Sequence, residues 1–367
     1  MKLCDVTLRE GDQLPGRDYD TDAKITAGRE LDSLGIPFIQ AGFPVTGEKD
    51  QRVVSTLSEE TDAQVVALAR AIPSDVEVAL EANADVIEVF APLRDRQLEC
   101  VIGKSREKMF DALRSCINIA RDGGASVHMT ILDGFRTDVE HVCTAIKRFP
   151  TVEYVGIADT VGTQTPPTVT SYLDELGVSV NLSAVGVHFH DDLGVATANA
   201  EAAYVAGVGK ADVSVASLGE RAGNTALEEI VAVGAIEYDE LFGCDADSLI
   251  PTCEQVLDRL GESINPRKSI LGHEVTSHES GLHTAVMFEE PSLFEPFDPA
   301  RFGGKRTLIF GSGTGRDAAG MILEQEGIDP TDARVETLLE GFAERKHFTL
   351  SEAKSLVRNK FDLQNDE

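Results

Sequence analysis

Eight apolar segments recur along the first two-thirds of the chain, and each is followed by a stretch with helical spacing. The segments are apolar on both faces, which is typical of strands covered on both sides of a parallel sheet. We expect strands at residues 3–8, 37–41, 64–69, 85–91, 126–132, 153–158, 185–190 and 212–217. Eight strand–helix units in succession predict a (β/α)8 TIM barrel rather than a doubly wound open sheet.

The pattern changes after about residue 240. A helical segment at 245–263 leads to a linker with Pro and Gly at 265–272, and further helices are expected between 316 and 359. We therefore expect residues 1–240 to form a catalytic barrel, and residues 241–367 to form a linker and a small, mostly helical accessory subdomain. We expect no C-terminal regulatory domain.

The net charge of the chain excludes some classes of binding partner. Acidic residues number 63 against 33 basic ones, which gives a formal net charge of −30. Such a charge repels nucleic acids and anionic membranes, so we expect neither as a partner. Strong acidity with few lysines also indicates a halophilic protein, because high salt screens the self-repulsion.

The lengths of the apolar runs and the spacing of the cysteines indicate the cellular compartment of the protein. No apolar run reaches the length of a bilayer span, and the sequence shows no signal peptide. The six cysteines are scattered and form no CxxC pair. We expect reduced thiols in a cytoplasmic protein.

His188 and His190 lie two residues apart at the end of the seventh expected strand. Side chains at positions i and i+2 of a strand leave by the same face, so both imidazoles can reach one point. A pair of polar residues at a strand end is the alternative, but two converging imidazoles favour a metal site.

Glu10 is the best candidate for a third ligand, because it follows the first expected strand and the ends of barrel strands share one rim. Two His and one carboxylate leave positions open for substrate oxygens. This set favours Mg²⁺ or Mn²⁺, with Zn²⁺ possible. Asn224 is a plausible fourth ligand or outer partner. The alternative for Glu10 is a salt bridge to Arg9.

Other polar residues suggest roles around this metal. Arg9 can stabilise a developing enolate or alkoxide oxygen, since its guanidinium keeps its charge. Arg136 and Thr160 can bind a substrate carboxylate, although Arg136 is equally explained as a surface residue. His278 and His283 lie outside the barrel, and either could be a general base or a polar cap at a helix N-terminus.

Six sequence blocks together resemble one family, the acetyl-CoA-dependent 2-oxoacid condensing enzymes. These are the isopropylmalate, homocitrate and citramalate synthases. The blocks are DVTLREGDQ at 5–13, GFP at 42–44, DTVG at 159–162, HFHDDLG at 188–194, GERAGN at 219–224 and HESGLH at 278–283, with GSGTGR at 311–316 matching further along. The resemblance extends over nearly the whole chain.

The resemblance implies a TIM barrel with a divalent metal on Glu10, His188 and His190, and Asn224 at or near it. It implies that Arg9 polarises the carbonyl of a 2-oxoacid, while Thr160, Arg136 and Gln13 help to bind substrate. It further implies His283, or failing that His278, as the accessory catalytic residue. Acetyl-CoA would supply the nucleophilic carbon, CoA would be released, and a homodimer is implied.

The sequence also departs from the family pattern. Glu at position 10 is usual in homocitrate synthases, whereas GERAGN at 219–224 looks like the isopropylmalate type. The loop at 92–97 replaces the usual Ser/Asp/His-containing loop that helps to select substrate. The sequence therefore predicts a 2-isopropylmalate or homocitrate synthase-like enzyme of amino-acid biosynthesis. The alternatives are a citramalate synthase acting on pyruvate, or a related acyl-CoA lyase.

Overall fold

The computed structural model describes residues 1–278, 286–288, 290–344 and 347–361. The chain divides into two compact units, Met1–Ile264 and Asn265–Glu367. In the part of the chain that is described, no helix is both long enough and apolar enough to cross a bilayer.

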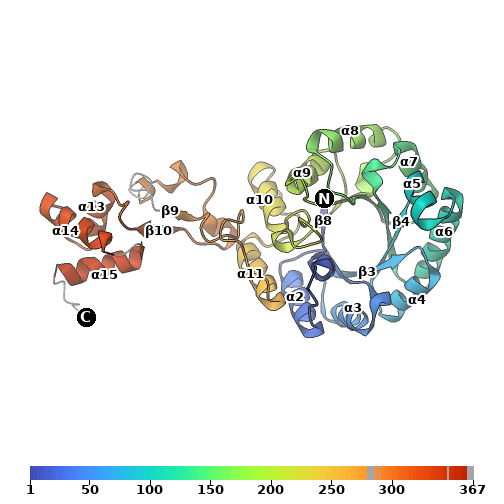
Figure 1. Ribbon diagram of the computed structural model, residues 1–367, viewed down its shortest axis with the longest axis horizontal. Coiled ribbons are helices and arrows are strands. Elements are labelled where there is room, and N and C mark those ends of the chain that lie inside the picture. Colours follow the sequence, from blue (N-terminus) through green and yellow to red (C-terminus); the bar gives the residue numbers. More distant parts are fainter. Residues whose placement is uncertain (279–285, 289, 345–346, 362–367) are drawn as a thin grey trace. The chain divides into compact units, whose positions relative to one another are not determined.

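The first unit is a closed barrel of eight parallel strands in sequence order, with helices around it (Figure 1). The strands are β1 (Lys2–Asp5), β2 (Phe38–Gly42), β3 (Gln64–Arg70), β4 (Val86–Pro92), β5 (Ser126–Leu132), β6 (Tyr154–Asp159), β7 (Val185–Phe189) and β8 (Lys210–Val213). Because β8 pairs with both β7 and β1, the sheet has no free edge. The predicted TIM barrel is confirmed.

Helices surround the strands of the barrel (Figure 1). They are α2 (Thr21–Ser33), α3 (Glu48–Glu60), α4 (Pro73–Glu81), α6 (Arg106–Asp122), α7 (Val139–Arg148), α8 (Pro166–Gly177), α9 (Ala196–Val205), α10 (Leu227–Glu237) and α11 (Leu249–Leu260). N-cap hydrogen bonds mark the first residues of two of these helices. The Asp20 carboxylate accepts the Ala23 N–H at α2, and the Ser105 hydroxyl accepts the Lys108 N–H at α6.

β1 and β8, the pair of strands that closes the barrel (the closing seam), have other bounds than those predicted. β1 ends at Asp5 instead of residue 8, because the Asp5 carboxylate accepts hydrogen bonds from the Thr7 N–H (2.9 Å) and hydroxyl (3.0 Å). These bonds turn the chain into the one-turn helix α1 (Thr7–Glu10). β8 spans Lys210–Val213 instead of 212–217. A fully buried Lys at its start hid this strand from an apolar pattern.

The barrel interior has an apolar layer and a polar layer. The apolar layer includes Phe38, Val86 and Tyr154, each the first residue of its strand, so it closes the N-terminal end. Polar side chains come further along their strands, namely Gln40, Glu88, Thr130 and Asp212, and all are buried. Lys210, the buried first residue of β8, reaches Glu88 and Asp212 in this layer. The polar layer therefore lies toward the C-terminal rim, where barrel enzymes carry their active sites.

The described residues of the second unit form a small sheet and several helices. The sheet has the order β11 (Phe348–Thr349), β10 (Thr307–Phe310) and β9 (Ser277–His278). The helices are α13 (Arg316–Gln325), α14 (Asp332–Ala343) and α15 (Leu350–Lys360). Phe310, Leu338 and Phe342 belong to its own apolar core. The glycine-rich segment at 311–315 links β10 to α13.

Candidate metal centre and catalytic cavity

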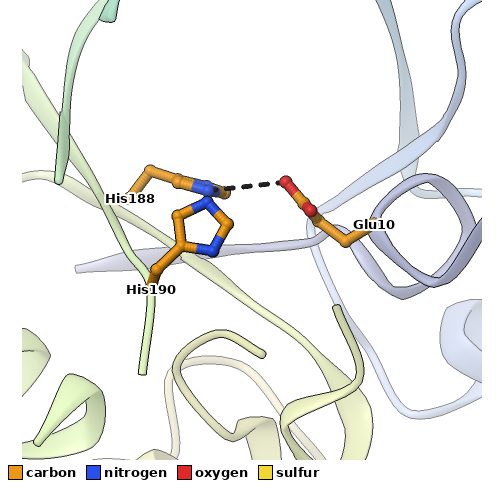
Figure 2. Close-up of side chains that lie close together, drawn as sticks. All are labelled: Glu10, His188 and His190. Atoms are coloured by element: carbon orange, nitrogen blue, oxygen red, sulfur yellow. Dashed lines mark ion pairs between the residues drawn. The ribbon is translucent and has the colours of Figure 1, made fainter. Parts of the chain in front are cut away.

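Glu10, His188 and His190 converge at the C-terminal rim of the barrel (Figure 2). Each offers one ligand atom, and these atoms lie within 4.8 Å of one another. Oε1 of Glu10 is 3.5 Å from Nε2 of His188. All three side chains are buried, with 2–7% of their surface exposed. The helical turn α1 aims Glu10 toward the histidines, and the strand period aims both imidazoles at Glu10.

Asn224 completes the group. It forms an isolated backbone bridge with His190, and its Nδ2 lies 3.2 Å from Nε2 of His188. A Cβ at Gly219 would come 2.0 Å from Oδ1 of Asn224 and 3.3 Å from Cβ of Glu10. The loop after β8 therefore reaches this close to the site only because residue 219 has no side chain.

Several buried polar atoms of this group lack protein partners. Oε2 of Glu10, Nδ1 of His190 and Oδ1 of Asn224 have no hydrogen-bond partner among the described residues. Buried polar atoms normally carry such partners, because leaving them unpaired costs free energy. Two imidazoles, a carboxylate and an amide oxygen are a donor set that suits a divalent cation. The residues therefore fit a bound metal ion.

Electrostatics keep these groups in metal-binding forms. Burial favours a higher pKa for Glu10, but the charges of Arg9, His188 and His190 outweigh it, so the pKa is lowered. Burial, helped by His188 and opposed by Glu10, lowers the pKa of His190 to about 4. At neutral pH Glu10 is a carboxylate and His190 is a neutral imidazole with a lone pair to donate.

A buried chain of polar contacts links His188 to Asp212, Lys210 and Glu88 in the barrel interior. Nδ1 of His188 lies 3.1 Å from Oδ2 of Asp212, and Nζ of Lys210 is 3.1 Å from Oδ1 of Asp212 and 3.3 Å from Oε2 of Glu88. Burial favours a higher pKa for Asp212, but Lys210 and the His188 hydrogen bond outweigh it and hold the pKa well below its ordinary value. Asp212 is therefore ionised, and it fixes the His188 ring.

Arg9 is held beside the carboxylate of Glu10. Its Nη1 pairs with Oε1 of Glu10, and its Nε donates to Oε1 of Gln40 at 2.6 Å. Gln40 in turn donates to Oε2 of Glu88 at 3.1 Å. The salt bridge that was the alternative for Glu10 thus exists together with the histidine cluster.

These groups line a cavity of about 200 Å³. Its lining consists of Arg9, Glu10, Gln13, Leu68, Glu88, Phe90, Thr130, Leu132, Ala158, Thr160, His188, His190, Asp212 and Glu220. The cavity therefore joins the metal-binding group, a fixed guanidinium and an apolar wall. Such an arrangement can bind an anionic oxygen-rich molecule at one end and an apolar group at the other.

Two models of known families match the chain. The one described as HMGL-like matches residues 1–241, and the one described as Homocitrate synthase post-HMGL domain-like matches residues 270–347. This chain belongs to the HMGL-like family. The resemblance to condensing enzymes predicted from the motifs is confirmed by these matches and by the curated relatives of the chain.

Curated relatives of this HMGL-like protein are archaeal synthases. "Homocitrate synthase AksA" of Methanosarcina mazei is 37% identical over 89% of this chain and 81% of its own length. "Putative (R)-citramalate synthase CimA" of Methanopyrus kandleri is 34% identical over 92% of this chain and 67% of its own. "Probable 2-isopropylmalate synthase" of the same organism is 33% identical over 92% and 68%. The chain is thus similar, at 33–37% identity, to synthases named for three different products.

Solved structures support the barrel of this family member. Hydroxymethylglutaryl-CoA lyase from Pseudomonas aeruginosa superposes with a TM-score of 0.65 at 22% identity, and the match covers 75% of this chain and 96% of the lyase. At this identity the likeness shows the fold alone.

The structure brings most of the predicted site residues of this HMGL-like protein to the cavity. Thr160 lines it, and its hydroxyl accepts the Asp133 N–H at 2.8 Å. Gln13 lines it beside Arg9. Arg136 does not line it, because Nε and Nη2 of Arg136 bind the Asp133 carboxylate at 2.6 and 2.9 Å.

The two predicted accessory histidines belong to the second unit. His278 lies in β9, with Nε2 3.6 Å from Oε1 of Glu295. His283 lies outside the described residues. His278 is the last residue of β9, and the residues that follow it, 279–285, lie outside the described part of the chain.

The sequence patterns predicted no role for Gln40, Glu88, Lys210 or Asp212. A signal was present, because each is a polar residue inside an apolar strand, at a position that faces the interior. Lys210 and Asp212 are two residues apart and so share the inner face of β8. Their partners could not be found from spacing, since Glu88 comes from a strand on the other side of the barrel.

Proposed function

We propose that this enzyme condenses acetyl-CoA with a 2-oxoacid, releasing CoA and a 2-hydroxy acid with an added carboxymethyl group. One observation carries the proposal: Glu10, His188 and His190 converge at the barrel rim with the guanidinium of Arg9 beside them. The synthases that share more than 30% identity with the chain support the same reaction class.

The metal ligands proposed here are Glu10, His188 and His190, with Asn224 as a fourth ligand or an outer partner. A divalent cation on these residues would supply Lewis-acid polarisation to the carbonyl and carboxylate oxygens of the substrate. The mixed nitrogen and oxygen donors favour Mg²⁺ or Mn²⁺ and also suit Zn²⁺.

Arg9 acts on the oxygen that gains charge in the reaction. Its guanidinium keeps its proton, and Gln40 holds it in one orientation. A preoriented cation stabilises a developing alkoxide without reorganising during the reaction. Removing this residue should therefore lower the rate of the chemical step more than substrate binding.

Thr160 and Gln13 orient the 2-oxoacid in this proposal. The Thr160 oxygen already accepts the Asp133 N–H, so its own hydrogen can be donated to a substrate carboxylate. Arg136 would have to leave Asp133 to reach the same group. We therefore assign the carboxylate contact to Thr160 and give Arg136 a contribution only after such a movement.

The bond changes follow from the proposed reaction. A base takes a proton from the methyl carbon of acetyl-CoA, and we assign this role to His283, with His278 as the second candidate. The resulting carbanion forms a bond to the carbonyl carbon of the 2-oxoacid, whose π electrons move to oxygen and are then protonated. Water cleaves the thioester, and CoA leaves as the thiol.

Oligomeric state and habitat complete the proposal. We infer a homodimer, as the family resemblance implies, and a cytoplasmic protein, because all six cysteines are free and five are buried. We also infer adaptation to high salt from the net charge of −30. Sedimentation as a monomer would contradict the first inference, and equal stability at low and high KCl would contradict the last.

A CoA-release assay tests the reaction. The protein is incubated with acetyl-CoA and, in separate reactions, pyruvate, 2-oxoisovalerate, 2-oxoglutarate and oxaloacetate, while a thiol reagent records free CoA. We expect release with at least one 2-oxoacid, loss of release with EDTA and recovery with Mn²⁺ or Mg²⁺. Release with no 2-oxoacid, or release that EDTA does not affect, would overturn the proposal.

A further inference from the structure

We infer that the cavity selects a 2-oxoacid with a short, uncharged aliphatic side chain. This inference rests on the proposed condensation and narrows its substrate. Glu10, His188 and Asp212 come from the region of β1, β7 and β8, which are neighbours in the ring.

The facing wall has an apolar patch toward the rim, formed by Leu68 from β3, Phe90 from β4 and Leu132 from β5, with Ala158 from β6 beside it. Glu88 and Thr130 line the cavity two residues earlier on β4 and β5, and the Thr130 hydroxyl donates to Glu88 at 2.6 Å. β3, β4 and β5 lie across the closed ring from the strands that carry the metal-binding group. A 2-oxoacid whose oxygens face Glu10 and the histidines therefore directs its side chain toward Leu68, Phe90 and Leu132.

The charges on the cavity lining exclude a second carboxylate on that side chain. Among the described lining residues, Arg9 is the one permanent cation, and it is already bound to Glu10 and Gln40. The remaining lining charges are mainly acidic and include Glu88 and Glu220. A distal carboxylate would lose water without gaining a positive partner.

Lys210 does not line the cavity, and its charge is paired with Glu88 and Asp212, which do. Arg94 and Arg136 both bind Asp133 and do not line it. Lys104 lines a separate pocket. Phe90 and Leu132 line both pockets, so they form the partition between Lys104 and the cavity.

The wild-type enzyme gives the first test. We expect kcat/KM for 2-oxoisovalerate, 2-oxobutyrate or pyruvate to exceed that for 2-oxoglutarate by about 100-fold or more, because a buried unpaired charge is costly. Equal or better activity with 2-oxoglutarate would overturn this inference and leave the proposed condensation intact. Activity with no 2-oxoacid would overturn the condensation itself.

Leu132→Arg gives the second test, because it places a cation on the apolar patch at a position that is only partly buried. We expect the ratio of kcat/KM for 2-oxoglutarate to that for 2-oxoisovalerate to rise by at least about 10-fold. Val178→Arg adds the same charge at an exposed residue outside the cavity, and it should leave the ratio unchanged. An unchanged ratio in a folded Leu132→Arg enzyme would overturn the inference.

Discussion

The carboxylate of Asp212 lies 3.1 Å from Nδ1 of His188, while Nε2 of the same ring faces Glu10. An ionised Asp212 accepts the Nδ1 hydrogen, and this fixes the tautomer in which Nε2 carries a lone pair. Lys210 keeps Asp212 ionised although both are buried. The orientation of His188 thus depends on two residues outside the proposed ligand set.

Replacing Asp212 with Asn should weaken metal binding. The amide can donate to Nδ1, which favours the tautomer whose Nε2 carries a hydrogen, so we expect Mn²⁺ affinity to fall about 10- to 100-fold. Isothermal titration with Mn²⁺ measures the change. The same substitution at exposed Asp122 serves as the control. Equal Mn²⁺ affinity in Asp212→Asn and wild type would rule out this positioning role.

Glu10→Gln keeps the size of the side chain and removes its charge. We expect loss of measurable Mn²⁺ binding together with loss of CoA release, because the two imidazoles remain without an anionic ligand beside them. Exposed Glu59→Gln on α3 is the matched control and should behave as wild type. Full Mn²⁺ binding by Glu10→Gln would show that the ion is held elsewhere.

Arg9→Gln separates catalysis from metal binding. The guanidinium repels a cation bound at Glu10, so Mn²⁺ affinity should stay equal or increase, whereas kcat should fall by about 10²- to 10³-fold. Steady-state kinetics and Mn²⁺ titration on the same preparation measure both quantities. Arg29→Gln, at a half-exposed Arg paired with Glu60, controls for loss of a surface charge. Retained kcat would exclude Arg9 from the chemical step.

Gly219→Ala tests the close approach of the loop after β8. The new Cβ would lie 2.0 Å from Oδ1 of Asn224, so Asn224 must move away from His188. We expect weaker Mn²⁺ binding and reduced kcat without loss of the barrel, as judged by far-UV circular dichroism. Gly313→Ala meets no atom within 4 Å and should have no such effect. Wild-type Mn²⁺ affinity in Gly219→Ala would contradict the arrangement.

His190 should make the metal-free protein sensitive to acid. Its pKa is lowered to about 4 by burial and by His188, whereas an unfolded chain has a His pKa of about 6.5. As pH falls from about 6.5 toward 4, the unfolded state gains a proton that the folded state refuses, so stability decreases, by roughly 3 kcal/mol at most. Above about pH 6.5, His190 is neutral in both states and its contribution to the free energy of unfolding no longer changes with pH.

Urea unfolding in EDTA between pH 4 and 8 measures this effect. The free energy of unfolding should fall more steeply with acid in wild type than in His190→Gln, which lacks the titrating group. Exposed His273→Gln should follow the wild-type curve. Parallel curves for wild type and His190→Gln would mean that His190 titrates alike in both states.

The errors at the closing seam show where sequence patterns fail. Residues 3–8 form a mostly apolar segment typical of a strand, but the carboxylate of Asp5 accepts hydrogen bonds from the N–H and hydroxyl of Thr7 and ends β1 early. Lys210 looks like a loop residue, yet it begins β8, because Glu88 and Asp212 neutralise it inside the barrel. In both places a tertiary or side-chain contact overrode the local pattern.

The sequence by itself determined the eight apolar strands and the shared face of His188 and His190, because both depend only on the spacing of residues within one segment. Only the closed barrel decided that Glu10 meets them, that Asp212 fixes the His188 ring and that Leu132 faces the site. These relationships join segments far apart in the chain. They depend on ring closure and strand register, which no local pattern encodes.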